Sequence, residues 1–233
     1  MRVAAINDVH GNLPALQAVL AELDGERIDV IVSGGDLVLG PFPAECLTAL
    51  RERDARFLHG NCERSMLGRS DDQNAWCADR LDADARTFVA AWPATISLDG
   101  VLYCHATPQN DEDILTRATP PEVVAAALAG ADEPLVVAGH THQQYEQAVG
   151  GKRLVNSGSV GLPYEGEPAA FWAIVENGEV ELRRTDYDVP TAVELIVGTG
   201  FPTAADWLEG SLVKPELPDE VTAFFERQAG RGA

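Results

Sequence analysis

The sequence contains little positive charge. Its 233 residues include 17 Lys and Arg against 37 Asp and Glu, which gives a formal net charge of -20. An acidic surface repels a phosphate backbone, whereas proteins that bind nucleic acid rely on basic side chains. The composition therefore disfavours a nucleic-acid-binding protein and favours a small substrate. Bound cations can nevertheless reverse the sign of the electrostatic potential near a metal site.

Long apolar runs are also missing. No stretch approaches the roughly 18 uninterrupted apolar residues that are needed to cross a bilayer. The opening segment MRVAAINDVHGN lacks the basic and long apolar regions of a signal peptide. The four cysteines form no CxxC pair and fit a reducing compartment. We therefore expect a cytoplasmic protein that does not associate with membranes.

No internal repeat or low-complexity segment stands out. Apolar residues make up 45% of the chain and charged residues 23%, close to the values of ordinary globular proteins. The length suffices for one domain with a two-sided core. We predict a single domain over residues 1–233, in which residues 64–100 form a candidate helical cap segment and residues 191–233 a C-terminal helical extension.

Short, nearly continuous apolar runs recur along the chain, and runs of this length are typical of strands buried on both faces. Five of them lie at residues 3–6, 30–32, 56–58, 101–104 and 135–138. Three later segments, at residues 152–155, 170–175 and 179–185, also have the character of strands. The turn Glu176-Asn177-Gly178 predicts a hairpin between the last two.

Helical patterns separate many of these runs. Leucines at positions 13, 16, 20 and 23 recur at helical spacing after a candidate cap at Asn12, and a second pattern follows Asp82. Two capping boxes, over residues 119–122 and 191–194, predict further helix starts. The alternation of strands and helices indicates a layered α/β fold with mixed β-sheets.

Candidate metal ligands follow five of the predicted strands. In chain order they are Asp8 and His10, then Asp36, Asn61 and His105, and finally His140 and His142. Side chains at the carboxyl ends of neighbouring strands converge on one edge of an α/β sheet. The sequence therefore predicts a site that is assembled from five strand ends.

The local sequence supports this site. Asp8 and His10 are two residues apart, and in an extended segment this spacing directs both side chains to the same side. Asp36 follows two glycines, which allow the backbone to pass close to another group. A lone histidine at a strand end is more often a structural hydrogen-bonding residue, but four histidines with two aspartates favour metal binding. The fifth histidine, His59, has no spacing that suggests a ligand.

The motifs DVH, GGD, GNC, CH and GHTH occur in this order along the chain. The series resembles the five-block signature of the calcineurin-like metallophosphoesterases. The GNC variant, DVHGN and the later VNSGSVGLP resemble the compact bacterial and archaeal phosphodiesterase-like branch. The resemblance covers residues 1 to about 190. It implies a four-layer α-β-β-α sandwich with two mixed β-sheets.

The resemblance also implies a dinuclear metal centre. Its first metal would be held by Asp8, His10, Asp36 and His142, and its second by Asp36, Asn61, His105 and His140. Asp36 would bridge the two ions, and Asp36, Asn61 and His105 would take part in catalysis. Nitrogen and oxygen ligands suit Mn, Fe, Co, Ni or Zn better than Ca or Cu(I), and the family makes manganese our first expectation.

Four further residues are candidates for substrate contact or for support of the ligands. Cys62 stands where many relatives carry a histidine that the resemblance links to protonation of the leaving group. Cysteine is a poorer acid at neutral pH, and a role as buried filler is an equal alternative. Glu63 is expected to orient a ligating histidine, and Arg64 to contact phosphate or to form a surface salt bridge. Asn12 is the fourth candidate.

These inferences predict a phosphoesterase that hydrolyses a small phosphorylated substrate through a metal-bridging hydroxide, with phosphodiesters favoured over alkyl monoesters. Two alternatives share the fold. A nuclease is disfavoured by the acidic composition, and a non-catalytic protein-interaction scaffold is disfavoured by the complete ligand set. Because one fold and metal site serve many substrates, the motifs leave the natural substrate, the metal and the oligomeric state open.

Overall fold

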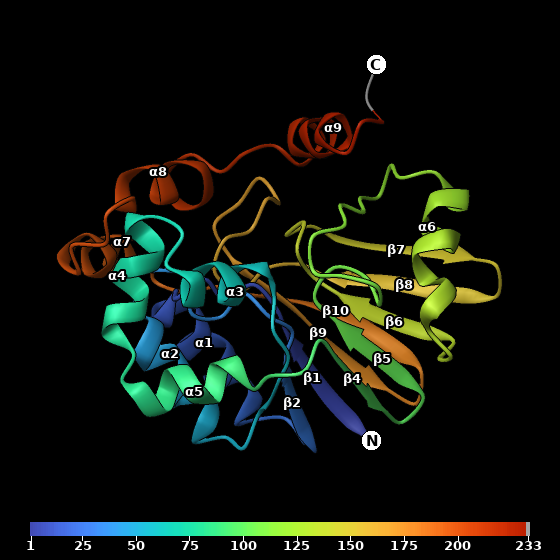
Figure 1. Cartoon of the computed structure of the whole chain (residues 1–233), viewed down its shortest axis with the longest axis horizontal. Helices are drawn as coiled ribbons and strands as arrows, with labels where there is room; N and C mark the ends of the chain where they lie inside the picture. Colours follow the sequence, from blue (N-terminus) through green and yellow to red (C-terminus); the bar gives the residue numbers. More distant parts are fainter. Residues whose placement is uncertain (232–233) are drawn as a thin grey trace.

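The computed structural model describes residues 1–231 and contains two five-stranded mixed β-sheets (Figure 1). The first sheet has the order β10-β9-β1-β2-β3 and consists of β10 (Glu179–Thr185), β9 (Ala170–Glu176), β1 (Arg2–Ile6), β2 (Val30–Ser33) and β3 (Arg56–Phe57). The second has the order β4-β5-β6-β8-β7 and consists of β4 (Thr95–Leu98), β5 (Val101–Cys104), β6 (Leu135–Ala138), β8 (Lys152–Ser157) and β7 (Gln144–Val149). In both sheets three neighbouring strands run parallel and the remaining pairings are antiparallel.

The two sheets pack against each other through alternating strand residues. In β1, Val3 and Ala5 contribute to the core between the sheets, whereas Ala4 and Ile6 belong to the core beneath the helices of the first sheet. This alternation is the side-chain period of a strand that is buried on both faces. Tyr103 of β5 enters the inner core from the second sheet.

Helices cover the outer faces of both sheets. The first sheet packs beneath helices that include α1 (Leu13–Leu23), α2 (Pro43–Arg51), α4 (Asp72–Arg80), α5 (Ala83–Ala90) and α7 (Val189–Gly198). The second sheet packs against α6 (Pro121–Ala127). The predicted four-layer α-β-β-α sandwich is therefore confirmed.

Several predicted local signals agree with the structure. The Asn12 side chain accepts a hydrogen bond from the amide of Ala15 at the start of α1, and Asp82 does the same for Ala85 at the start of α5. In the turn between β9 and β10, Asn177 and Gly178 both have positive φ angles, as a two-residue hairpin turn requires.

The two predicted capping boxes are wrong. Helix α6 begins at Pro121, and the Thr119 hydroxyl donates to the Glu226 carboxylate instead of capping the helix. Helix α7 begins at Val189, and its cap is Asp188, which accepts from the amide of Thr191. In both cases the threonine hydroxyl donates to a carboxylate, that of Glu226 for Thr119 and that of Asp188 for Thr191.

The C-terminal part returns across the molecule. After α7 the chain forms α8 (Ala204–Leu208), a π-helical turn (Glu209–Val213) and α9 (Pro218–Gln228). Figure 1 shows α9 on the side of the molecule opposite the N-terminus. Gln143 fixes its first turn by donating to the carbonyl of Pro218 and accepting from Thr222. Within residues 1–231, every helix is too short or too polar to span a lipid bilayer.

Candidate metal centre

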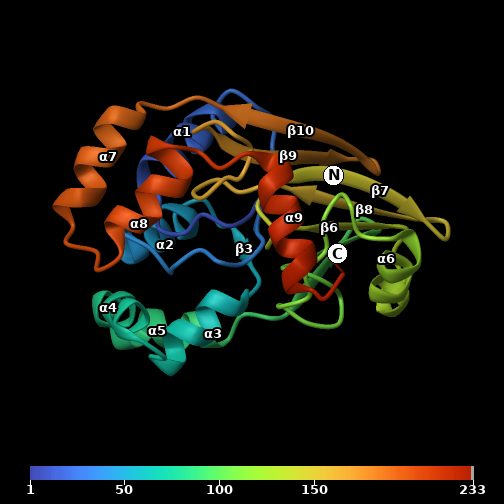
Figure 2. The same ribbon diagram turned by 90° about the horizontal axis from the view of Figure 1, so that it is seen from above.

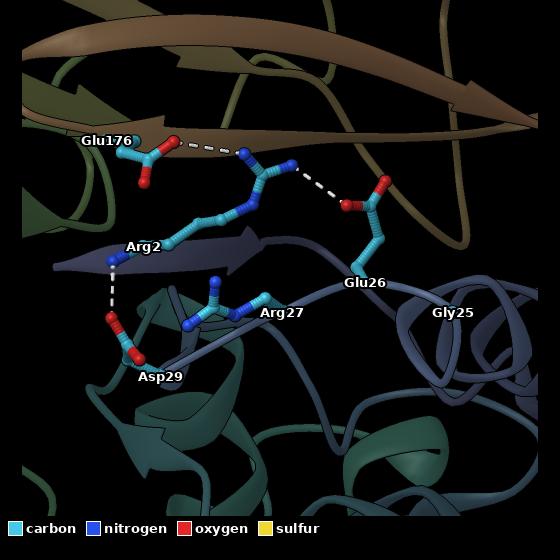
Figure 3. Close-up of a pocket in the computed structure, with 6 residues that line it drawn as sticks. All are labelled: Arg2, Gly25, Glu26, Arg27, Asp29 and Glu176. Carbon is cyan, nitrogen blue, oxygen red and sulfur yellow. Dashed lines mark hydrogen bonds and ion pairs between the residues drawn. The ribbon is translucent and has the colours of Figure 1, made fainter.

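One large surface hollow lies far from the strand ends that carry the candidate ligands. It has a volume of about 480 Å³ and is lined by residues near the start of β1, among them Arg2, Glu26 and Glu176 (Figure 3). Arg2 forms ion pairs of 2.8 Å with Glu26 and 3.0 Å with Glu176, so these charges satisfy one another. This hollow contains no histidine or cysteine, and its chemistry is that of a surface salt-bridge network.

The carboxyl ends of five strands instead bring all seven candidate ligands together. Asp8 and His10 follow β1 and Asp36 follows β2. The remaining four begin α3 (Asn61–Gly68) or follow β5 and β6 in the second sheet: Asn61, His105, His140 and His142. Asp8 is completely buried and four others are nearly so, whereas Asn61 and His140 are partly exposed. The site therefore lies where the two sheets meet and opens to solvent at Asn61 and His140.

Burial is near complete at five of the seven positions: Asp8, His10, Asp36, His105 and His142. Each of the five sits at a loop that leaves a strand, where ordinary surface loops would expose polar side chains. Burial of so many titratable groups in one place is costly unless charges are compensated. The arrangement therefore calls for a compensating cation.

The backbone at the site is unusual for L-residues. Asp8, His10, Asp36, His140 and His142 all have φ angles between +46° and +69°. Non-glycine residues with positive φ are uncommon and concentrate at functional sites, where the surrounding structure holds them. The prediction that Asp8 and His10 share an extended segment is therefore wrong: a left-handed turn, not strand periodicity, brings their side chains together.

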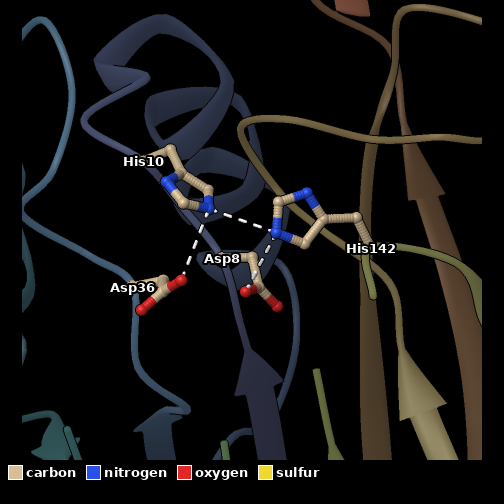
Figure 4. A group of neighbouring side chains, drawn as sticks. All are labelled: Asp8, His10, Asp36 and His142. Atoms are coloured by element: carbon tan, nitrogen blue, oxygen red, sulfur yellow. Dashed lines mark hydrogen bonds and ion pairs between the residues drawn. The ribbon is translucent and has the colours of Figure 1, made fainter. Parts of the chain in front are cut away.

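The first group of ligands comprises Asp8, His10, Asp36 and His142 (Figure 4). His142 Nε2 lies 3.2 Å from Asp8 Oδ1 and 3.1 Å from His10 Nε2, and His10 Nε2 lies 3.7 Å from Asp36 Oδ2. Ligands bound at about 2.1 Å with tetrahedral or octahedral angles are separated by roughly 3.0–3.4 Å. The spacing within this group is close to that of atoms around one ion.

The hydrogen bonds of the two imidazoles fix which nitrogen carries a lone pair. Nδ1 of His10 faces the carbonyl oxygen of Leu39 at 3.3 Å, and Nδ1 of His142 faces that of Leu162 at 2.7 Å. A carbonyl oxygen only accepts, so each Nδ1 carries the hydrogen and each Nε2 presents a lone pair. Two lone pairs facing each other at 3.1 Å repel unless a cation lies between them. In addition, Asp8 Oδ1 is buried and accepts no hydrogen bond from residues 1–231.

The second group comprises Asp36, Asn61, His105 and His140. His105 directs Nδ1 to the carbonyl of Gly34 at 3.0 Å, so in the neutral ring the lone pair lies on Nε2. That Nε2 lies 3.0 Å from Asn61 Oδ1, 3.2 Å from His140 Nδ1 and 3.4 Å from Asp36 Oδ2. Acceptor atoms again converge on one point, and the donor set of nitrogen and oxygen fits a divalent transition metal.

One atom belongs to both groups. Asp36 Oδ2 lies 3.7 Å from His10 Nε2 in the first group and 3.4 Å from His105 Nε2 in the second. The other oxygen, Oδ1, accepts a hydrogen bond from the Cys62 amide at 2.9 Å. The residues present thus fit two adjacent cations with Asp36 between them.

In the protein without metal, the carboxylates of Asp8 and Asp36 stay ionised and attract a positive charge to the site. Burial opposes ionisation of Asp8 and Asp36, yet the neighbouring histidines hold the pKa of both carboxyls below its usual range. Burial likewise disfavours a charged His105, but the Asp36 carboxylate outweighs it and raises the pKa of His105 to about 10. Burial and the neighbouring imidazoles lower the pKa of His10 and of His140 to about 4. Neutral His10 and His140 keep their lone pairs for a ligand role, and a cation beside Asp36 would replace the proton on His105 Nε2.

Comparisons with known proteins agree with this geometry. Residues 1–178 match the family model described as calcineurin-like phosphoesterase superfamily domain. The chain belongs to the calcineurin-like phosphoesterase superfamily.

Three individual relatives extend the match over most of the chain. An uncharacterised protein of Methanocaldococcus jannaschii is 28% identical over 88% of this chain and 95% of its own length. The crystal structure of a metallophosphoesterase from Sphaerobacter thermophilus superposes with a TM-score of 0.76 at 27% identity, covering 90% of this chain and all of that one. A hypothetical protein of Pyrococcus horikoshii OT3 has a TM-score of 0.79 at 19% identity, covering 90% and 96%, which shows a shared fold.

Within this calcineurin-like fold, two glycines permit the close approach of the ligands. A Cβ atom on Gly60 would lie 2.2 Å from Asp36 Oδ1, and one on Gly139 would lie 2.1 Å from Asp8 Oδ2. Both distances are far below contact distance, so only glycine fits. The glycines of the GNC and GHTH motifs are therefore explained by the carboxylates that pass beside them.

Glu63 supports the bridging aspartate through the backbone. It is only 1% exposed, and its carboxylate accepts hydrogen bonds from the amides of Asp36, Leu37, Val38 and Gly60 at 2.8–3.2 Å. Burial and the Asp36 charge raise the pKa of Glu63, and the amides oppose that rise. Glu63 was expected to orient a ligating histidine. It instead holds the backbone of the loop that carries Asp36.

The other three supporting candidates lie in different surroundings. Cys62 is 7% exposed, and burial together with the Asp36 charge raises the pKa of its thiol well above its usual range. The Asn12 amide is fully buried and bonds to Ala15, Gly161 and Tyr187, which makes it a structural link. Arg64 is exposed and pairs with Asp111 and Glu112.

Two contacts at the site have no signal in the ligand motifs. The Tyr164 ring stacks on His142 with a centroid distance of 5.0 Å and an interplanar angle of 17°. The Ser159 hydroxyl donates to the carbonyl of Asp8 at 2.7 Å and accepts from the Leu162 amide. Both residues lie in or next to the VNSGSVGLP segment, and only the folded chain shows that this segment supports Asp8 and His142.

Proposed function

We propose that this chain is a dinuclear-metal-dependent phosphodiesterase that hydrolyses small organic phosphodiesters. The observation that carries the proposal is the convergence of lone pairs on two adjacent points that share Asp36 Oδ2. Asp8, His10, Asp36 and His142 would hold the first divalent ion, and Asp36, Asn61, His105 and His140 the second. When bound, such a pair supplies Lewis-acid activation of water and neutralises charge on the phosphoryl group. Manganese is our first choice, with Fe, Co, Ni or Zn as alternatives.

The partly exposed residues indicate where substrate would approach. Asn61 and His140 are more open to solvent than the other ligands, so the phosphoryl group would enter at the second group. Asn61 can ligate through Oδ1 while its Nδ2 donates to a phosphoryl oxygen. Arg64 lies three residues further along α3, on the same side of the helix. Its guanidinium is suited to a phosphate oxygen and offsets the acidic character of the chain.

The preference for diesters rests on charge and on the lack of a strong acid at position 62. A diester carries less negative charge than a monoester at neutral pH, so an acidic protein repels it less. A buried thiol of raised pKa is a poor proton donor to a departing alkoxide. Substrates whose leaving group departs without a proton are therefore favoured over alkyl monoesters.

The test is hydrolysis by protein whose metal content is known. Chelation should abolish release of p-nitrophenol from bis(p-nitrophenyl) phosphate, and added Mn²⁺ or a similar cation should restore it. Under the same conditions, kcat/KM for an alkyl phosphomonoester should be much lower. Full hydrolysis by protein verified to be metal-free would contradict the metal requirement. Absence of any hydrolysis by fully metal-loaded protein would favour the non-catalytic alternative.

A further inference from the structure

A small apolar hollow lies between α3 and α5, on the side of the first sheet where Figure 2 shows these helices together. It has a volume of about 240 Å³. Its walls are the side chains of Leu67, Val89, Ala90 and Trp92. His59, Arg64 and Glu63 line it as well, and the Glu63 carboxylate is held by four backbone amides. Apolar walls with a cation among them suit a ligand that has an apolar body and an anionic end.

The hollow adjoins a second one that reaches the candidate metal centre. A second hollow of about 190 Å³ is also lined by His59 and Arg64, and it reaches His105 of the second ligand group. A ligand held at His105 could therefore extend past Arg64 into the apolar hollow. These shared residues distinguish the hollow from the one at Arg2, whose lining includes neither of them and no candidate ligand.

The base of the hollow is held in place by aromatic packing. The Trp92 ring stacks on Phe57 at 4.8 Å with an interplanar angle of 14°, and Phe88 meets Trp92 edge-on at 5.9 Å. Trp92 is thus fixed before any ligand arrives. A side chain that is already fixed loses little conformational entropy when a ligand binds. Contact with the Trp92 ring therefore contributes more to affinity than contact with a mobile side chain would.

Arg64 keeps free donors at the junction of the two hollows. Its bonds to Asp111 at 2.8 Å and to Glu112 at 3.0 Å both come from Nη2. Its Nε and Nη1 groups donate to no other described residue. Those donors can meet a phosphate oxygen while the acidic pair holds the side chain in position.

We infer that the hollow formed by Leu67, Val89, Ala90 and Trp92 binds an aromatic ring esterified to the substrate's phosphate. The inference rests on the proposed function, since it assumes that the phosphoryl group lies at the metals. A volume of about 240 Å³ is below the roughly 300–1,000 Å³ of a pocket for a whole ligand. It therefore suits one ring of a substrate, and the substrate class is an aryl or arylalkyl phosphodiester.

The test is calorimetric binding of two phosphonates to the manganese-loaded protein. Benzylphosphonate carries an aromatic ring, and methylphosphonate carries none. We expect benzylphosphonate to bind about tenfold more tightly, the lower end of what a filled apolar pocket contributes. Its heat-capacity change on binding should also be more negative, because apolar surface is buried.

Two variants test whether the tighter binding of benzylphosphonate arises in this hollow. Ala90→Phe fills the hollow from its exposed rim and should reduce the benzyl advantage to less than about twofold, with methylphosphonate affinity unchanged. Ala125→Phe, on the exposed face of α6 and away from both hollows, is the matched control and should keep the advantage. Should Ala90→Phe fail to fold, Leu67→Ala removes one wall and should lower the advantage by about threefold.

Each outcome bears on a different claim. Equal affinities of the two phosphonates in the wild-type protein, or an unchanged benzyl advantage in a folded Ala90→Phe variant, overturn the assignment of the hollow alone. If methylphosphonate itself does not bind to the metal-loaded protein, the proposed function is overturned and this inference with it.

Discussion

The backbone amide of Cys62 donates to Asp36 Oδ1 at 2.9 Å, and this bond turns Oδ2 of the same carboxylate toward both groups of histidines. The two carboxylate oxygens of Asp36 therefore have different roles. One fixes the orientation of the side chain, and the other lies where a ligand to two cations is needed. Position 62 thus contributes to the site through its backbone, whatever its side chain does.

Asp36→Asn should lower metal occupancy at both sites. The amide oxygen of asparagine can replace Oδ1 and accept from Cys62, which leaves the Nδ2 amide, a donor, facing the cations. His142→Ala removes a ligand of the first group only and should mainly reduce occupancy there. Metal analysis of the purified variants distinguishes the two, with His59→Ala as a control that should retain wild-type content. Two tightly bound ions in Asp36→Asn would rule out the bridge.

Glu63→Gln should destabilise the protein by about 2–4 kcal/mol, since a side-chain NH2 would replace an oxygen that now accepts from two buried amides. The loop carrying Asp36 would shift, so kcat/KM should also fall by roughly 10–100-fold. Urea unfolding of the metal-free proteins measures the first effect. Glu52→Gln, at the exposed C-terminal end of α2, serves as control. A change in unfolding free energy no larger than that of the control would show that these hydrogen bonds of Glu63 are dispensable.

Much of the fold could be predicted because buried strands carry their pattern in the local sequence. The observed β5, β6 and β10 have the predicted bounds. The strands β4 and β7 were not predicted, because they are edge strands whose polar residues break the apolar run.

The ligand identities could be predicted from motifs, but the geometry that joins them could not. The left-handed turns at Asp8 and His10 depend on hydrogen bonds to the distant backbone of Gly35 and Asp36. The role of Glu63 likewise depends on hydrogen bonds from backbone amides of another loop, at residues 36–38. Such long-range contacts leave no periodicity in the sequence, so local patterns do not reveal them.

Glu226 should stabilise the docking of α9 in a pH-dependent way. Its carboxylate, 9% exposed, accepts from Thr116, Thr119 and Arg231. The Arg231 guanidinium and these hydroxyls outweigh burial and lower the pKa of Glu226 to about 2. Because the folded-state pKa lies below the unfolded value, this stabilisation is complete above about pH 4.5 and is lost as the pH falls toward 2.

Glu226→Gln should therefore cost about 1–3 kcal/mol at pH 6, and the difference from wild type should shrink as the pH is lowered to about 3. Hydrogen exchange of the α9 amides together with urea unfolding measures the effect across this range. Glu220→Gln, on the exposed side of the same helix, should show neither the loss nor the pH dependence. A difference that stays constant from pH 6 to pH 3 would show that ionisation of Glu226 does not hold the helix.

Cys62 should limit which leaving groups the enzyme can expel. An aryl oxide departs without a proton, whereas an alkoxide of high pKa needs an acid, and the buried thiol is a weak one. Wild-type kcat/KM should therefore fall steeply as the leaving-group pKa rises, and Cys62→Ala should leave that slope unchanged. Cys62→His places an acid with a pKa of about 6.5 at the same position.

We expect Cys62→His to gain about 10²-fold on poor leaving groups relative to good ones, the lower end of the range for general acid catalysis. The gain should decline above the pKa of the new imidazole, because only the protonated ring donates. The measurement is the dependence of kcat/KM on leaving-group pKa for wild type, Cys62→Ala and Cys62→His at equal metal content. A slope in Cys62→His that is unchanged or steeper would show that position 62 does not control protonation and that the proton comes from another group.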